Sequence, residues 1–172
     1  MALVAAALCG CSQSSAASPP STASTNGAVP VPRNAQSARV QSIVDGDTMH
    51  LVGVGAGPLT GGDLRVRLLE INAPETHGTV ECFGPEATET LARLTPVGST
   101  VRVVADRETH DSYGRPLLYI WNADGTFVNE QLVRSGAAVV LFIPPNGQYL
   151  PVMRQAEQAA RDERAGQWAA CQ

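Results

Sequence analysis

The chain has 172 residues and a formal net charge of −4, and all 12 of its basic residues are arginine. This length allows one modest domain with appendages. Proteins that hold nucleic acid by bulk phosphate attraction usually present a basic surface, so the charge argues against a tight, non-catalytic nucleic-acid binder. A metal-dependent enzyme is less constrained, because its cation supplies positive charge locally.

The first eleven residues have the character of an export signal. Residues 1–10 are small and apolar but too few to span a bilayer. They run into Leu8-Cys9-Gly10-Cys11, which is similar to the Leu-x-Gly-Cys end of a bacterial lipoprotein signal and makes Cys11 the expected lipidation site. No basic residue precedes the apolar stretch, so we expect the true start to lie upstream and the signal to be truncated. The alternative to lipidation is that Cys9 and Cys11 are two inert thiols in a disordered end of the chain.

Residues 12–37 are rich in Ser, Ala, Pro and Thr and carry almost no large apolar side chains. Such a segment cannot bury enough surface to offset its ordering entropy, so a disordered tether is predicted. We therefore expect an exported protein that is either anchored to the cell membrane by lipid or secreted. The lipid is its only expected contact with a membrane.

The pattern changes at residue 38, where the predicted domain begins. Val40 to Val44 and Thr48 to Val52 are predicted strands joined by an Asp-Gly-Asp turn, in which Gly46 can adopt a positive φ. Apolar residues alternate over 64–69, which predicts a third strand with one buried face. Pro74 lacks an amide donor and ends this extended segment.

The second half of the domain mixes helices with strands. Pro85 is well placed to begin a helix, and a second helix is predicted to stop at Gly136, a natural C-cap. Strands are expected at 101–104 and 117–121, an extended segment at 137–143, and a last helix at 150–165. These elements predict an α+β domain, a small five-stranded OB-fold β-barrel with about three helices, because an open sheet would leave exposed edges.

Two cysteines lie inside this domain. Cys82 just precedes the first predicted helix and Cys171 is the penultimate residue. In an exported protein we expect a disulfide between them, closing a loop of about 90 residues worth about 2–4 kcal/mol. Two reduced, buried thiols are the alternative.

Four short segments carry the chemistry. They are Asp45-Gly46-Asp47-Thr48, Arg67 with Ile71-Asn72-Ala73-Pro74-Glu75-Thr76, Ser112-Tyr113-Gly114-Arg115, and Phe127-Val128-Asn129-Glu130. Together they offer oxygen ligands for a hard cation, a further carboxylate and two arginines, which can hold a phosphodiester and deliver water to it. Taken singly, each has a plain alternative: Asp47 as a turn residue, Arg67 as a solvent-facing strand residue, and Arg115 as a turn cation.

In this order, and with Trp168 near the C-terminus, the segments resemble the thermonuclease (staphylococcal nuclease-like) family over essentially all of residues 38–172. The resemblance implies an OB-fold barrel with three helices. It also implies a phosphodiesterase site on the protein surface that depends on one calcium ion.

The same resemblance assigns residues to the metal and to the phosphate. Asp47, the side chain of Asn72 and the carbonyl of Ala73 would be calcium ligands, and Arg67 and Arg115 would grip the scissile phosphate. The family pattern has an aspartate where this chain has Asn72. The amide keeps an oxygen but loses a charge, so we expect an active enzyme that needs more calcium.

The remaining candidates are a base and two contacts for substrate. Glu75 is the candidate general base, with an ordinary loop carboxylate as the alternative. Tyr113 is expected to contact a phosphate or stack on a base, and Phe142, where the family pattern has a tyrosine, can stack but cannot donate a hydrogen bond. Asn129 and Glu130 are expected to anchor their helix to loops by hydrogen bonds.

The sequence thus predicts an exported, monomeric nuclease that hydrolyses DNA and RNA with little sequence preference. Single strands are expected to be favoured, and products are expected to end in 3′-phosphate. The alternative is a non-catalytic OB-fold module that binds nucleic acid or a protein partner. Such a module would not need Arg67, Glu75 and Arg115 together. A structural envelope lipoprotein would rest on the tether alone.

Overall fold

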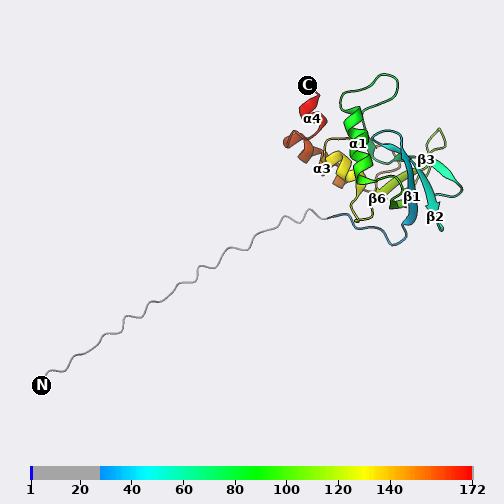
Figure 1. Ribbon diagram of the computed structural model, residues 1–172, viewed down its shortest axis with the longest axis horizontal. Helices are drawn as coiled ribbons and strands as arrows, with labels where there is room; N and C mark the ends of the chain where they lie inside the picture. The colour runs from blue at the N-terminus through cyan, green and yellow to red at the C-terminus, as the bar shows by residue number, and fades with distance from the viewer. Residues whose placement is uncertain (2–27, 172) are drawn as a thin grey trace.

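The computed structural model describes Met1 and residues 28–171, and within this part of the chain it has seven strands and four helices (Figure 1). The strands are β1 (Gln36–Ile43), β2 (Thr48–Val54), β3 (Asp63–Leu68), β4 (Ile71–Asn72), β5 (Thr100–Val104), β6 (Leu117–Trp121) and β7 (Val139–Val140). The helices are α1 (Gly84–Leu94), α2 (Val128–Arg134), α3 (Leu150–Asp162) and α4 (Gln167–Ala170).

Five of the strands close into a barrel in the order β1-β2-β3-β6-β5, with β1 pairing β5 to complete it. The alternation seen in the sequence sends Met49, Leu51 and Val66 inward, where each is fully buried. The predicted α+β fold with a five-stranded OB-type barrel is confirmed. In the view of Figure 1, α1 stands between the barrel strands on one side and α3 and α4 on the other.

Two register relations bring distant segments together at one end of the barrel. In the β2–β3 pair Thr48 lies opposite Arg67, and the Leu68 amide donates to the Asp47 carbonyl at 2.9 Å. In the parallel β3–β6 pair Arg67 lies opposite Leu117, just after the turn that carries Arg115. The first turn, the third strand and this later turn are therefore neighbours.

A small second sheet, which the sequence analysis did not anticipate, adds a further neighbour. β4 pairs antiparallel with β7, so that Ile71 lies opposite Val140 and Asn72 opposite Val139. The Leu141 amide donates to the carbonyl of Glu70 at 2.9 Å. The segment after β7 is thereby laid alongside the segment that links β3 to β4.

Helix α2 is fixed to the barrel by one buried side chain. The amide oxygen of Asn129 accepts from the Ile120 backbone N–H at 2.9 Å, and its nitrogen donates to the carbonyl of Leu69 at 2.9 Å. The anchoring role predicted for Asn129 is thus confirmed, although its partners lie in β6 and directly after β3 rather than in loops.

The ordered domain begins before residue 38, inside the segment assigned to the tether. Strand β1 starts at Gln36, and Val29 and Val31 pack against the core. The indole nitrogen of Trp121 donates to the carbonyl of Val29 at 2.9 Å. The apolar valines and this buried donor hold residues 29–37 against the barrel. The signal, Cys11 and the tether over 12–27 lie outside the described residues.

The predicted disulfide between Cys82 and Cys171 is present, with the two Cα atoms 5.9 Å apart. It joins the residues just before α1 to the end of the chain after α4. In the described residues, no helix is long and apolar enough to cross a bilayer.

Candidate active site

The turn between β1 and β2 is built around two acids and a glycine. The side chain of Asp45 accepts from the Asp47 backbone N–H at 3.0 Å. Gly46 does not take the positive φ expected from the sequence. It is required for close approach instead, since a Cβ there would lie 2.6 Å from that of Ala73 and 2.9 Å from that of Ala87.

Asp47 is buried and accepts hydrogen bonds on both of its side-chain oxygens. Oδ2 accepts from the Ala73 backbone N–H at 2.8 Å and is 2.9 Å from Nη2 of Arg67, while Oδ1 accepts from the Thr48 hydroxyl at 3.0 Å. Burial raises the pKa of Asp47 to about 6, and the attraction of Arg67 offsets only part of that effect. A second cation beside this carboxylate would be electrostatically favourable.

Arg67 is held by four oxygens. Nη1 donates to the carbonyls of Leu68 and Ile71, at 2.8 and 2.9 Å, and Nη2 donates to Oδ1 of Asn72 at 3.1 Å as well as pairing with Asp47. Burial lowers the pKa of Arg67, against the attraction of Asp47. The guanidinium plane is thus fixed before any substrate arrives.

Two of the predicted metal ligands, Asp47 and Asn72, contact Arg67 directly, and the backbone N–H of Ala73, whose carbonyl is the third predicted ligand, donates to Asp47. No cluster of three or more His, Cys, Asp or Glu suited to a metal occurs among residues 28–171. A cation here would rest on the carboxylates of Asp47 and Asp45, with the amide and carbonyl oxygens in support. Such an all-oxygen set fits a hard cation such as calcium, with less negative charge than three carboxylates would give.

The turn that carries Arg115 is organised by Asp111. Its Oδ1 accepts from the backbone N–H groups of Tyr113 and Arg115, and its Oδ2 accepts from Nε of Arg115 at 2.7 Å. Burial raises the pKa of Asp111, but the hydrogen bonds from Arg115 outweigh it, so the pKa is lowered overall. The Arg115 guanidinium also lies over the Tyr113 ring, 5.6 Å from its centroid.

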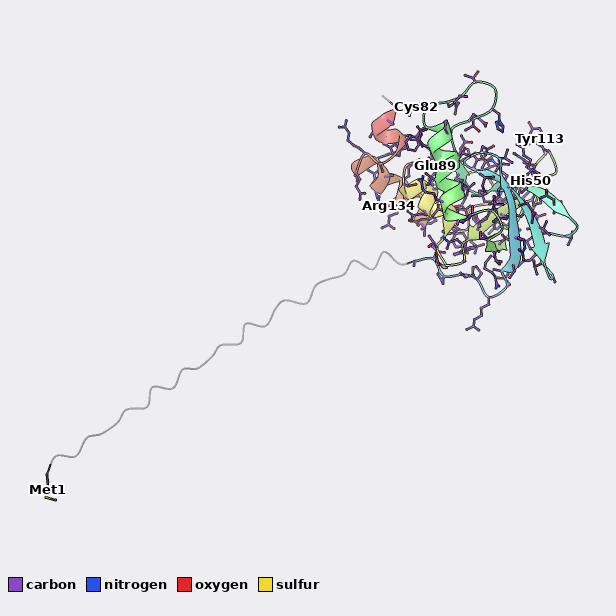
Figure 2. All side chains as sticks on the ribbon, in the orientation of Figure 1. Met1, His50, Cys82, Glu89, Tyr113 and Arg134 are labelled. Carbon is purple, nitrogen blue, oxygen red and sulfur yellow. A yellow bond between two sulfur atoms is a disulfide. The ribbon has the colours of Figure 1, made fainter. Side chains whose placement is uncertain are left out.

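Both arginines line one cavity of about 390 Å³, together with Tyr113. Tyr113 is 85% exposed and lies at the outer edge of the domain (Figure 2). Apolar side chains form much of the remaining wall: Leu68, Leu69, Ile71, Leu117, Leu141 and Ile143. The cavity therefore combines two fixed cations and one exposed aromatic ring with apolar surface and with polar and acidic residues, which are Glu70, Glu108, Asp111, Ser112 and Asn146.

Phe142 does not line this cavity. It is half exposed and lies in a separate hollow with Asp106 and Pro145, where its ring would touch a Cβ placed on Gly147. Its neighbours Leu141 and Ile143 line the cavity of the arginines instead.

Glu75 lies two residues beyond Ala73, at the start of the loop between β4 and α1, and its side chain is exposed. Its backbone N–H donates to the side chain of Glu81 at 3.0 Å, and its carbonyl accepts from the Glu81 N–H at 2.9 Å. Its carboxylate is close enough to raise the pKa of Arg67. The predicted base is therefore near Arg67, but it does not line the cavity that holds both arginines.

Sequence reasoning gave no individual role to Asp45, although it quoted the segment that contains it, and it missed Asp111, Leu141 and Ile143. The two acids belong to the Asp-Gly-Asp and Asp-Ser-Tyr-Gly-Arg segments, where a short carboxylate followed by backbone amides is a recognisable turn signal. The two apolar residues carried no signal apart from their alternation around Phe142.

Comparisons with known proteins identify the family to which the chain belongs. The sequence model of the family described as "Staphylococcal nuclease homologue" matches residues 65–170. The chain is 35% identical over 137 residues to the thermonuclease of Staphylococcus intermedius, covering 77% of this chain and 76% of that protein. It is 31% identical over 139 residues to the thermonuclease of Staphylococcus hyicus, covering 78% of this chain and 77% of that protein.

Endonuclease YhcR of Bacillus subtilis (strain 168) is 32% identical over 139 residues, which is 75% of this chain but 11% of that larger protein. The residues matched by the family model, 65–170, include Arg67, Arg115 and the Glu75 loop. The chain belongs to the staphylococcal nuclease family.

Proposed function

We propose that this nuclease is calcium-dependent and hydrolyses phosphodiester bonds in both DNA and RNA, leaving 3′-phosphate ends. The observation that carries the proposal is the placement of Arg67 and Arg115 on one cavity, with Asp47 bound directly to Arg67. Two fixed cations beside a buried carboxylate suit a phosphate whose negative charge grows as phosphorus becomes five-coordinate.

The arginines have complementary roles in this proposal. Arg67 is oriented by four oxygens that occupy its Nη1 and Nη2 hydrogens, so its Nε–H is the group that can donate to a phosphate oxygen with little reorganisation. Arg115 uses Nε to bind Asp111, which leaves its terminal nitrogens to reach a second oxygen. Between them the phosphate is held and its charge is offset.

Glu75 is the proposed general base, taking a proton from the attacking water. Asp47, Asn72 and the carbonyl of Ala73 would hold the calcium, with Asp45 adding a second carboxylate. When bound, the ion would supply positive charge at the phosphate and make its water a better nucleophile.

The walls of the cavity support weak base discrimination. Leu141 and Ile143 can contact a base or sugar but cannot form hydrogen bonds with base edges, and Tyr113 offers a ring on which any base can stack. A pocket of this kind takes an unstacked nucleotide, so we propose a preference for single strands. Monomeric action, export and lipid attachment at Cys11 complete the proposal, and the disulfide suits an oxidising compartment.

The test is cleavage of fluorescent single-stranded DNA and RNA in calcium and after addition of a chelator. We expect the chelator to abolish cleavage, and Arg115→Ala and Glu75→Gln to lower kcat by about 100-fold or more. Arg93→Lys is the matched control, since Arg93 is an exposed helix residue paired with Glu89, and it should retain full activity.

Product ends can be examined by treating the fragments with a phosphatase and then extending them with a polymerase. Fragments that are extended only after phosphatase treatment carry 3′-phosphate. Undiminished cleavage in chelator, or binding without cleavage, would contradict the proposal, and the second outcome would favour a non-catalytic binding module.

A further inference from the structure

Glu81 makes a reciprocal contact with the proposed base. Its side-chain Oε2 accepts from the backbone N–H of Glu75 at 3.0 Å, and its own backbone N–H donates to the Glu75 carbonyl at 2.9 Å. These two hydrogen bonds close the neck of the loop over residues 75–81. The tip of that loop, residues 77–80, is exposed.

The Glu81 side of the neck is fixed to the domain by three further features. Its carbonyl accepts from the Gly84 N–H at 3.1 Å. A Cβ on Gly84 would lie 2.5 Å from the Glu75 carbonyl oxygen, so the first residue of α1 lies directly against the backbone of Glu75. The next residue, Cys82, is tied to Cys171 by the disulfide and lies near the start of α1 (Figure 2).

We propose that Glu81 is a positioning residue for Glu75: its carboxylate holds the Glu75 backbone amide and so sets the direction in which the Glu75 side chain points. The inference rests on the proposed role of Glu75 as general base. A catalytic group on an exposed loop needs such support, because a displacement of about 1 Å can cost on the order of 100-fold in rate.

The contact is suited to orientation rather than to global stability. The hydrogen bond from Glu75 to Glu81 lies in solvent, and the Glu81 side chain is exposed. Removal of the Glu81 carboxylate should therefore leave the fold intact while increasing the mobility of Glu75 at the start of the loop. The loss should fall on kcat and not on KM, since Glu81 lines none of the cavity that holds both arginines.

The test compares Glu81→Ala, which removes the acceptor, with Glu81→Gln, which keeps an oxygen acceptor without charge. We expect Glu81→Ala to lower kcat by about 10- to 100-fold with KM changed by less than about 3-fold. Glu81→Gln should restore most of the loss. Glu86→Ala, which removes another exposed acid in the first turn of α1, is the matched control and should behave like the parent.

A double variant separates positioning from other causes. In Glu75→Gln protein, Glu81→Ala should cost no more than about 3-fold, because the group it positions is already gone. Full kcat in Glu81→Ala, equal losses in Glu81→Ala and Glu81→Gln, or losses that multiply in the double variant would each overturn the inference. If Glu75→Gln itself keeps full activity, the proposed base is wrong, which is a different and recognisable outcome.

Discussion

Asn72 presents its side-chain oxygen to Arg67, 3.1 Å from Nη2, and lies in the chain directly before Ala73. An aspartate here would keep that contact and would add a negative charge beside Asp47. Every other proposed ligand would remain in place. The position therefore offers a clean test of how charge controls cation affinity in this site.

We expect Asn72→Asp to tighten calcium binding by about 10-fold or more, because a unit charge about 4 Å from a cation contributes several kcal/mol that desolvation only partly cancels. Calorimetric titration of calcium measures the affinity directly, and half-saturation of activity should shift with it. Asn72→Ala, which lacks the oxygen, should bind more weakly than the parent. Superimposable titrations of the parent and Asn72→Asp would contradict the assignment.

Buried Glu70, which also lines the cavity of the two arginines, and half-buried Asp106 share a hydrogen-bond partner, and this arrangement makes stability depend on pH. The Tyr119 hydroxyl is 2.5 Å from Oε1 of Glu70 and 2.9 Å from Oδ2 of Asp106. One hydroxyl proton cannot serve both oxygens, so a second proton on Glu70 suits the arrangement. Burial raises the pKa of Glu70, and the hydrogen bonds from Tyr119 and the Tyr149 amide offset only part of this.

The direction of the effect follows from linkage. A raised pKa means that folded Glu70 keeps its proton where the unfolded chain has lost it, so the free energy of unfolding falls as pH rises above 4.5. Glu70→Gln should abolish this decline, so that its free energy of unfolding increases relative to that of the parent from pH 4.5 upward. Urea unfolding at a series of pH values measures the difference. Burial raises the pKa of Asp106, but hydrogen bonds, of which that from the Gly147 amide is the strongest, lower it overall. Asp106→Asn should therefore lose the most unfolding free energy at neutral pH, where the carboxylate is charged in the parent. Parallel pH profiles for the parent and Glu70→Gln would refute the assignment of a proton to folded Glu70.

At the scale of elements, α2 depends on one side chain for its polar contacts with the barrel. Asn129 is fully buried and bonds backbone groups of Ile120 and Leu69. Asn129→Leu should lower the free energy of unfolding by about 2–4 kcal/mol, since it strands two buried backbone groups. Equilibrium urea unfolding measures the loss, with the exposed Gln158→Leu in α3 as control. A loss below about 1 kcal/mol would show that α2 is held by apolar packing alone.

The disulfide joins two elements that the sequence separates by 89 residues. Replacing both Cys82 and Cys171 by serine should lower the free energy of unfolding by about 2–4 kcal/mol, mainly by enlarging the unfolded ensemble. Thermal unfolding of this variant beside the parent, with and without reductant, checks the value. Reductant should shift only the parent, and an unchanged midpoint there would contradict the estimate.

The barrel strands and three helices were predictable from sequence because alternation, helical spacing and turn residues are local signals. The β4–β7 pair was not, since two-residue strands carry no period and their pairing is set by the rest of the fold. The early start of β1 was missed because Gln36 is polar. Its burial depends on hydrogen bonds with the backbone of Leu59, which composition does not reveal.

In the candidate site, too, some features were predictable from the sequence and others depend on the rest of the fold. The family resemblance placed Asp47, Arg67, Asn72 and Ala73 together, and in the structure Arg67 contacts Asp47 and Asn72 while the Ala73 N–H donates to Asp47. Phe142 was singled out because the family pattern has a tyrosine there, but in the structure its neighbours Leu141 and Ile143 line the cavity of the arginines and Phe142 does not. The side on which each of these side chains lies depends on the pairing of β7 with β4, and amino-acid composition does not reveal that pairing.

The whole molecule has little positive charge to offer a polyanion. Its formal charge is −4, and several surface arginines are already paired with acids: Arg93 with Glu89, Arg134 with Glu163, and Arg161 with Glu157. Arg67 and Arg115 face the cavity, and Arg65 lines a neighbouring hollow with Tyr113. Substrate binding should therefore draw on two or three phosphate contacts plus stacking and apolar contact.

This predicts a shallow dependence of binding on salt. Each phosphate contact to a single strand contributes about 0.7 to the slope of log affinity against log salt, so two or three contacts give about 1.4–2.1. Fluorescence anisotropy with a labelled oligonucleotide and the Glu75→Gln variant measures the slope without cleavage. Arg65→Ala should reduce it by about 0.7 if Arg65 is the third contact, whereas Arg93→Ala should leave it unchanged. A slope above about 4 would mean that binding spreads over a basic surface far larger than this cavity, and the two-arginine site would then account for only a small part of recognition.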